Sequence, residues 1–160
     1  MDLFKKLRAD EEQFFVLKEN HWDVKDDINY PKTKDYTYYL QAENKEKLQK
    51  ICMVLNQLKD RGYKVSVRPH PIYSEIQTIK SIFREIDVEK TSDVSIEESI
   101  QRTKYAISLF STVLQESYKY GTGVIIDDVA DVDAYIKLKD LDYIMLSKEH
   151  RLLSEVIGEN

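Results

Sequence analysis

The sequence has one cysteine, three prolines and four glycines among its 160 residues, and each scarcity excludes a class of protein. The single cysteine, Cys52, excludes an internal disulfide and fits a reducing compartment. So few prolines and glycines leave no flexible linker that would divide the chain. No apolar run approaches the roughly 18 residues that span a bilayer, and residues 1–8 lack the apolar core of a secretory signal. We therefore expect a cytoplasmic protein without a transmembrane segment.

An excess of positive charge is absent as well. The formal net charge is −5 and the pI is about 5.3, so we expect no nucleic-acid partner held by the overall electrostatic field. The three histidines, His21, His70 and His150, are far apart and have no cysteine partner, so we expect no metal site. Hydrophobic residues make up 42% of the chain and charged residues 33%, which is typical of one globular domain.

Short β-rich runs alternate with amphipathic helical patterns along most of the chain. Leu48, Ile51 and Leu55 recur at helical spacing after a potential N-cap at Asn44, and Gly62 ends that pattern. Strands are predicted at 36–41, 64–68, 86–88, 105–110, 122–126 and 143–146. Helices are predicted at 44–62, 76–83, 95–103, 111–120 and 132–138, and from 147 onward.

This alternation predicts an α/β fold: a Rossmann-like, doubly wound, mostly parallel sheet with helices on both faces. We assign residues 36–160 to this domain. Residues 1–35 fit the pattern least, and we expect an N-terminal extension or an irregular first element there. Within it, Phe14–Leu17 is a candidate strand, and Asp23–Lys34 is typical of an exposed loop.

Three features follow predicted strands, where open α/β sheets bind their ligands. In Arg68-Pro69-His70-Pro71 two prolines fix the loop around a histidine, which is either a phosphate or carboxylate ligand or a surface side chain on a rigid turn. Ser111-Thr112 lies where a strand meets a helix, which suits either an anion site or a plain helix cap. Glu116 lies further along that helix, as either a ribose ligand or a solvated side chain.

Taken in order, these motifs resemble those of a known enzyme class. RPHP, then FST, then ESYKYGTGVII resembles the C-terminal, nucleotide-sugar donor-binding domain of bacterial GT-B glycosyltransferases. The sequence is most similar to the sialyltransferase and capsule or lipooligosaccharide group, which carries an HP motif and a paired Ser/Thr motif. CDP-glycerol glycerophosphotransferases of teichoic acid synthesis have a similar arrangement. The resemblance covers roughly Tyr36 to Ile126.

The resemblance implies a role for each motif residue. His70, Ser111 and Thr112 would bind the donor phosphate, with Arg68 either as a second cation or in a salt bridge, and Glu116 would bind the ribose. The implied reaction is inverting sugar transfer from a nucleotide sugar in bacterial surface polysaccharide synthesis, without a metal or other cofactor. The similarity to sialyltransferases implies a CMP-linked donor. The resemblance identifies no catalytic residue in this chain.

Two departures from the family bear on activity. The general-base motif of two acidic residues and a glycine is missing, because Asp127-Asp128 is followed by Val129. A GT-B enzyme also has two Rossmann-like domains, and this chain has length for one, so we expect it to be an incomplete catalyst alone. A separate acceptor-domain chain or a homo-oligomer would then be its partner. The alternative is a non-catalytic α/β interaction or nucleotide-binding module.

Two further patterns have simpler interpretations. Asp127-Asp128 follows a late strand, whereas phosphorylated receiver domains place an acidic pair after the first, so we interpret the pair as a solvated strand end or a helix cap. Tyr36, Tyr38 and Tyr39 share one strand, where packing between sheet and helices is favoured over sugar stacking.

Overall fold

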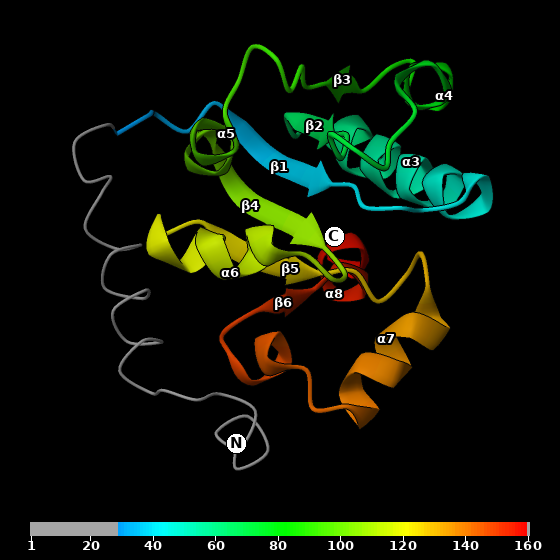
Figure 1. Ribbon diagram of the computed structural model, residues 1–160, viewed down its shortest axis with the longest axis vertical. Helices are drawn as coiled ribbons and strands as arrows, with labels where there is room; N and C mark the ends of the chain where they lie inside the picture. The colour runs from blue at the N-terminus through cyan, green and yellow to red at the C-terminus, as the bar shows by residue number, and fades with distance from the viewer. Residues whose placement is uncertain (1–28, 160) are drawn as a thin grey trace.

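A computed structural model describes residues 29–159 of the chain. They form an α/β fold around a six-stranded sheet in the order β3-β2-β1-β4-β5-β6, with every neighbouring pair parallel (Figure 1). The predicted Rossmann-like fold is therefore confirmed, since this order is that of doubly wound dinucleotide-binding domains. The strands are β1 (Lys34–Tyr39), β2 (Val65–Arg68), β3 (Asp87–Val88), β4 (Thr103–Ser108), β5 (Gly123–Ile126) and β6 (Arg151–Leu152).

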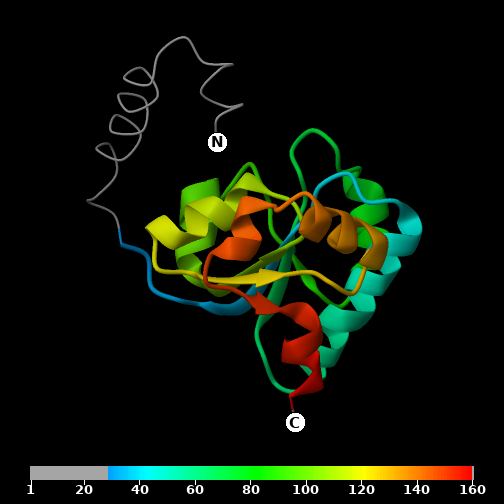
Figure 2. The same cartoon turned by 90° about the horizontal axis from the view of Figure 1, so that it is seen from below.

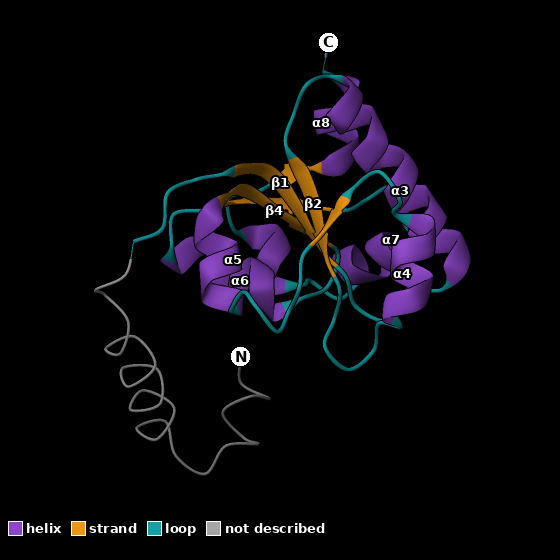
Figure 3. Ribbon diagram, turned by 90° about the horizontal axis from the view of Figure 1, so that it is seen from above, coloured by secondary structure: helices purple, strands orange, loops and turns teal. Residues whose placement is uncertain are grey.

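Helices cover both faces of the sheet (Figures 2 and 3). They are α3 (Lys45–Asp60), α4 (Ile76–Ile82), α5 (Ile96–Arg102), α6 (Thr112–Lys119), α7 (Val132–Asp140), the 3-10 helix η1 (Ile144–Ser147) and α8 (Leu153–Gly158). Side chains alternate between the faces along each strand. Tyr36 and Tyr38 pack with α3, α4 and α8 on one face, whereas Tyr39 packs with α5 on the other. The packing interpretation of these tyrosines is confirmed by their burial.

The predicted helix caps hold α3 and α5. The Asn44 side chain accepts the backbone N–H of Lys47, and the Ser95 hydroxyl accepts that of Glu98. Glu98 pairs with Arg102 one turn later, 2.6 Å away. Both helices thus begin where the sequence places them.

The C-terminal part differs from the prediction. Residues 143–146 were expected to form a strand, but Tyr143 is the N-cap of the 3-10 helix η1 and residues 144–146 lie within it. Met145 of η1 is buried against Leu114 and Val124. A short apolar run suits either structure, and here it covers a sheet face instead of extending the sheet. The last strand is the two-residue β6, and the last helix begins at Leu153 instead of residue 147.

The N-terminal predictions fall largely beyond residues 29–159. The candidate strand Phe14–Leu17 and residues 23–28 lie outside the described part of the chain. The expected exposed loop ends earlier than predicted, because Lys34 already pairs with Thr103 in the sheet. Within residues 29–159, no helix has the length and apolarity to cross a membrane.

Candidate functional site

The chain leaves the two central strands, β1 and β4, toward opposite faces of the sheet. From β1 it continues into α3 on one face, and from the neighbouring β4 it continues into α6 on the other. Such a divergence opens a crevice at the carboxyl ends of the strands, which is where doubly wound folds bind ligands. This edge of the sheet, which we call the carboxyl edge, is therefore the candidate functional site.

A cavity of about 180 Å³ lies at this divergence, and we call it the switch-point pocket. Its lining comes from the ends of β1, β4 and β5 and from the loops and first turns that follow them. The lining residues are Tyr38, Gln41, Ala42, Glu43, Lys47, Leu109, Phe110, Asp127, Ala130 and Asp131. A second hollow of about 210 Å³ shares Gln41 and Glu43 and extends to Tyr73 and Ser74 in the loop after β2. The edge is thus hollowed on both sides of the β1–α3 loop.

Asp127 forms the buried end of the switch-point pocket. Its residue is only 1% exposed, and Tyr38, at 2%, donates its hydroxyl to the Asp127 Oδ2 at 2.5 Å. The Asp127 Oδ1 accepts the backbone N–H groups of Val129 and Ala130 at 2.8 and 2.9 Å. Burial first, and then the Asp127 carboxylate, hold the pKa of Tyr38 well above its ordinary value, so the phenol keeps its proton. The expectation of a solvated strand end is wrong for Asp127, because these three bonds replace its water.

Two more carboxyl groups and one ammonium complete the charged lining. Glu43 is half-buried, and burial raises the pKa of its carboxyl group, with the Asp127 charge adding to the effect. The Lys47 ammonium lies 2.5 Å from the Asp131 carboxylate. That contact raises the pKa of Lys47 and lowers the pKa of Asp131, which also caps α7. Three carboxyl groups therefore face one ammonium that is already paired.

His70 lies in the loop after β2, and one of its ring nitrogens holds that loop. The Nδ1 accepts the backbone N–H groups of Ile72 and Tyr73 at 3.1 and 3.3 Å, and the ring stacks on Tyr73 with centroids 4.5 Å apart. An accepting nitrogen carries no proton, so the proton of a neutral ring is on Nε2. The imidazole is half-buried, and Nε2 makes no hydrogen bond to another of the described residues.

Ser111 and Thr112 lie at the beginning of α6, on the same edge of the sheet. Ser111 is the N-cap, and its buried hydroxyl accepts the backbone N–H of Val113 at 3.2 Å. Thr112 is exposed, and Glu116 is half-buried further along the helix. The cap interpretation of Ser111 is confirmed, and the exposed Thr112 hydroxyl stands beside the positive end of the helix dipole.

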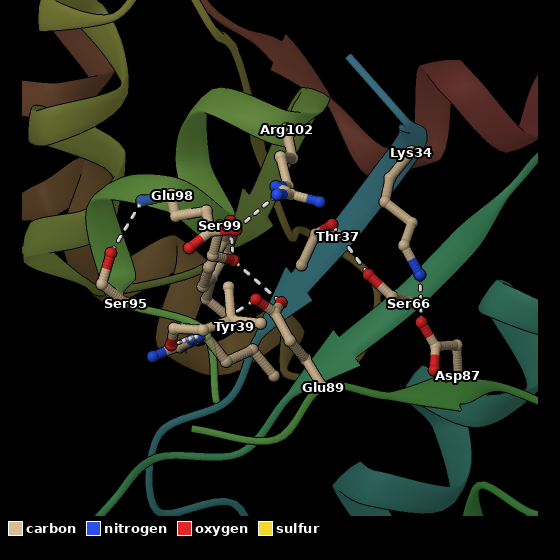
Figure 4. Close-up of polar contacts among 12 residues, drawn as sticks. Lys34, Thr37, Tyr39, Ser66, Asp87, Glu89, Ser95, Glu98, Ser99 and Arg102 are labelled. Atoms are coloured by element: carbon tan, nitrogen blue, oxygen red, sulfur yellow. Dashed lines mark hydrogen bonds and ion pairs between the residues drawn. The ribbon is translucent and has the colours of Figure 1, made fainter. Parts of the chain in front are cut away.

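Arg68, the last residue of β2, forms the salt bridge that the sequence left open, on the face of the sheet that α5 covers. Its guanidinium is 3.0 Å from the Glu89 carboxylate and donates to the Val94 carbonyl oxygen at 2.9 Å. Ser99 donates to the other Glu89 oxygen, and the Ser99 and Tyr39 hydroxyls are 2.9 Å apart (Figure 4). These residues form one polar network beneath α5. The structure does not bring Arg68 together with His70 and Ser111.

The switch-point pocket contains residues that the sequence did not single out. Gln41, Glu43 and Phe110 each lie a few residues beyond a strand end, and Lys47 and Asp131 lie on the first turn of a helix and at a helix cap. Their position after parallel strands was a usable signal, because those strand ends meet on one edge. The pairing of Tyr38 with Asp127, 89 residues apart, had no local signal in the sequence.

No protein-family model matches the chain, and no curated protein sequence matches it. Within the described residues 29–159, no three or more His, Cys, Asp or Glu side chains are grouped in a way that would hold a metal ion.

Proposed function

We propose that residues 29–159 form the nucleotide-sugar donor-binding half of a glycosyltransferase. The observation that carries the proposal is the position of two motifs around β1. The His70 loop follows β2 and the α6 N-terminus follows β4, and these are the strands on either side of β1. Strands are about 4.8 Å apart in a sheet, so β2 and β4 are roughly 10 Å apart and the two motifs lie on either side of the end of β1.

The chemistry of these two motifs suits the leaving group of glycosyl transfer. Negative charge develops on the phosphate as the nucleotide departs, and preorganised donors stabilise it. The His70 Nε2–H, the Thr112 hydroxyl and the backbone at the beginning of α6 would supply those donors. Glu116, on the same helix, would accept the ribose hydroxyls. Arg68 has no part in this site, because Glu89 holds its guanidinium.

Exposed apolar side chains on the same edge favour a half that faces a second domain or chain. Ile72 and Tyr73 follow β2, Phe110 follows β4 and Val132 follows β5, and all four are largely exposed. In a GT-B enzyme the acceptor domain faces the donor site across this edge. Exposure of several large apolar side chains along one edge is typical of interaction surfaces.

The test is thermal unfolding of the purified chain with CMP, CDP, UDP and GDP. A ligand that binds the folded state stabilises it by about 2.7 kcal/mol at 100 times its Kd, so one nucleotide should raise the Tm. The shift should vanish in His70→Asn, whose side-chain oxygen replaces the Nδ1 acceptor within the loop but lacks the Nε2–H. His150→Ala, in which the substituted histidine adjoins β6, is the matched control and should keep the shift.

No shift with any of the four nucleotides at millimolar concentration contradicts the proposal. The non-catalytic interaction module then becomes the better explanation of the exposed apolar edge. A shift that survives in His70→Asn would place the nucleotide elsewhere on the molecule.

A further inference from the structure

The switch-point pocket adjoins the proposed phosphate site through consecutive residues. Phe110 lines the pocket, and Ser111, the next residue, caps α6. A group attached to a phosphate at the α6 N-terminus would therefore reach the pocket directly. In a nucleotide sugar, the group attached to the terminal phosphate is the glycosyl unit.

The volume and the aromatic side of the pocket suit one sugar ring. About 180 Å³ is below the size of a pocket for a drug-sized ligand, so it has room for a single ring and not for a nucleoside as well. The Phe110 side chain is 62% exposed while its ring contacts Tyr143, with centroids 5.4 Å apart. Packing the C–H face of a sugar on this ring would remove apolar surface from water.

The polar lining suits hydroxyl groups and disfavours an acidic sugar. Glu43, Asp127 and Asp131 contribute three carboxyl groups, whereas Lys47 contributes one ammonium that Asp131 already pairs. Carboxylates accept hydrogen bonds from hydroxyl and ammonium groups, and the Gln41 side chain can both donate and accept. A carboxylate on the sugar would meet like charge here in a partly desolvated site.

We propose that the switch-point pocket is the glycosyl subsite and that its sugar carries no carboxylate, being a neutral or amino sugar. This inference rests on the proposed function, because the pocket gains its role from a phosphate at the α6 N-terminus. It departs from the sialyl group that the sequence resemblance implies, since sialic acid is a carboxylate. The substrate class is thus set by the charge of three side chains at the ends of β1 and β5.

The test compares matched donors whose sugars differ in charge, by calorimetric titration of the full chain. The pair uses the nucleotide that binds: UDP-glucose with UDP-glucuronate, GDP-mannose with GDP-mannuronate, or CDP-glucose with CDP-glucuronate. The neutral sugar should bind more tightly than its nucleotide alone, and the acidic sugar roughly tenfold more weakly than the neutral one.

Two substitutions localise the effect. Glu43→Gln should reduce the difference in affinity between the acidic and the neutral donor. Glu46→Gln should leave that difference unchanged, because Glu46 is an exposed acid on the first turn of α3. Phe110→Ala should abolish the gain from the neutral sugar and keep nucleotide binding. Leu141→Ala, which truncates another exposed apolar side chain, is its control.

The outcomes separate the two proposals. If no nucleotide binds, both fail. If a nucleotide binds in a His70-dependent manner but the acidic sugar binds as tightly as the neutral one, only the glycosyl subsite is overturned. The glycosyl subsite is also overturned if the neutral sugar adds as much affinity to the nucleotide in Phe110→Ala as in the wild type.

Discussion

Replacing Tyr38 by Phe tests whether the buried hydrogen bond to Asp127 holds the carboxyl edge together. The substitution removes one oxygen from a side chain that is 2% exposed and leaves the ring in place, so cavity formation contributes little. The lost bond is 2.5 Å long and has a carboxylate acceptor, a class that contributes about 1.5–3 kcal/mol. Asp127 keeps its two backbone donors, so we expect the free energy of unfolding to fall by about 2 kcal/mol.

For a chain of 160 residues this corresponds to a fall in Tm of about 4–8 °C at neutral pH. The assay is thermal or urea unfolding of wild type and Tyr38→Phe side by side. Tyr63→Phe is the control, because Tyr63 is exposed and its hydroxyl should contribute less than about 0.5 kcal/mol. A loss below about 0.5 kcal/mol in Tyr38→Phe as well would refute the reasoning.

The pH dependence of the free energy of unfolding, compared between wild type and Tyr38→Phe, is a second test of the Tyr38–Asp127 hydrogen bond. Burial and Asp127 raise the pKa of Tyr38 in the folded protein above the value of about 10 in the unfolded chain. The stabilisation from its proton is thus complete below about pH 10 and is lost as pH rises toward the folded value. Wild type should therefore lose stability above about pH 10 faster than Tyr38→Phe, and their difference should narrow. A constant difference up to pH 11 would contradict the assigned environment of Tyr38.

Three further predictions concern single features of the fold. Ser111→Ala removes the N-cap of α6 and should lower the free energy of unfolding by about 1 kcal/mol in urea titration, whereas Ser111→Asp should retain most of it. Gly123→Ala would place a Cβ 2.5 Å from the Tyr105 ring and should lower the free energy of unfolding by about 1–3 kcal/mol. The control Gly158→Ala meets no atom within 4 Å and should be nearly neutral. Equal losses of stability in the two variants would rule out the close contact. Arg68→Met leaves the Glu89 carboxylate, whose side chain is 14% exposed, without its cation and should cost about 2 kcal/mol. Adding Glu89→Leu should recover part of that loss, and a double variant less stable than the single one would contradict this.

The fold was predictable because its signals are local. Helix α3 has its cap at Asn44, its apolar stripe and its stop near Gly62 within one stretch, and the structure has all three. The strands β2, β4 and β5 are short apolar or β-branched runs between turn signals, and they were found within about two residues. The prediction for residues 143–146 was wrong because their apolar side chains suit a strand and a buried helical turn equally. The packing of Met145 against Leu114, which is a long-range contact, determines which of the two forms.

The site was predictable in position but not in composition. Strand ends identified the edge, and with it His70 and Ser111. Charge pairing was not visible, because Arg68 and Glu89 are 21 residues apart and Tyr38 and Asp127 are 89 apart. These long-range pairs decide which side chain remains available to a ligand. Glu89 engages the Arg68 guanidinium, and Tyr38 with two backbone N–H groups engages the buried Asp127 carboxylate.

The carboxyl edge holds two opposite electrostatic environments within a few residues of each other. The α6 N-terminus and the His70 Nε2 favour an anion, whereas Glu43, Asp127 and Asp131 disfavour one. A nucleotide alone, or an acidic peptide, satisfies only the first environment. A nucleotide joined to a neutral sugar satisfies both, because its charge is confined to the phosphates. The affinity gained on adding the neutral sugar to the nucleotide therefore measures whether the two environments act on one ligand, and an absent gain would mean that they serve different ones.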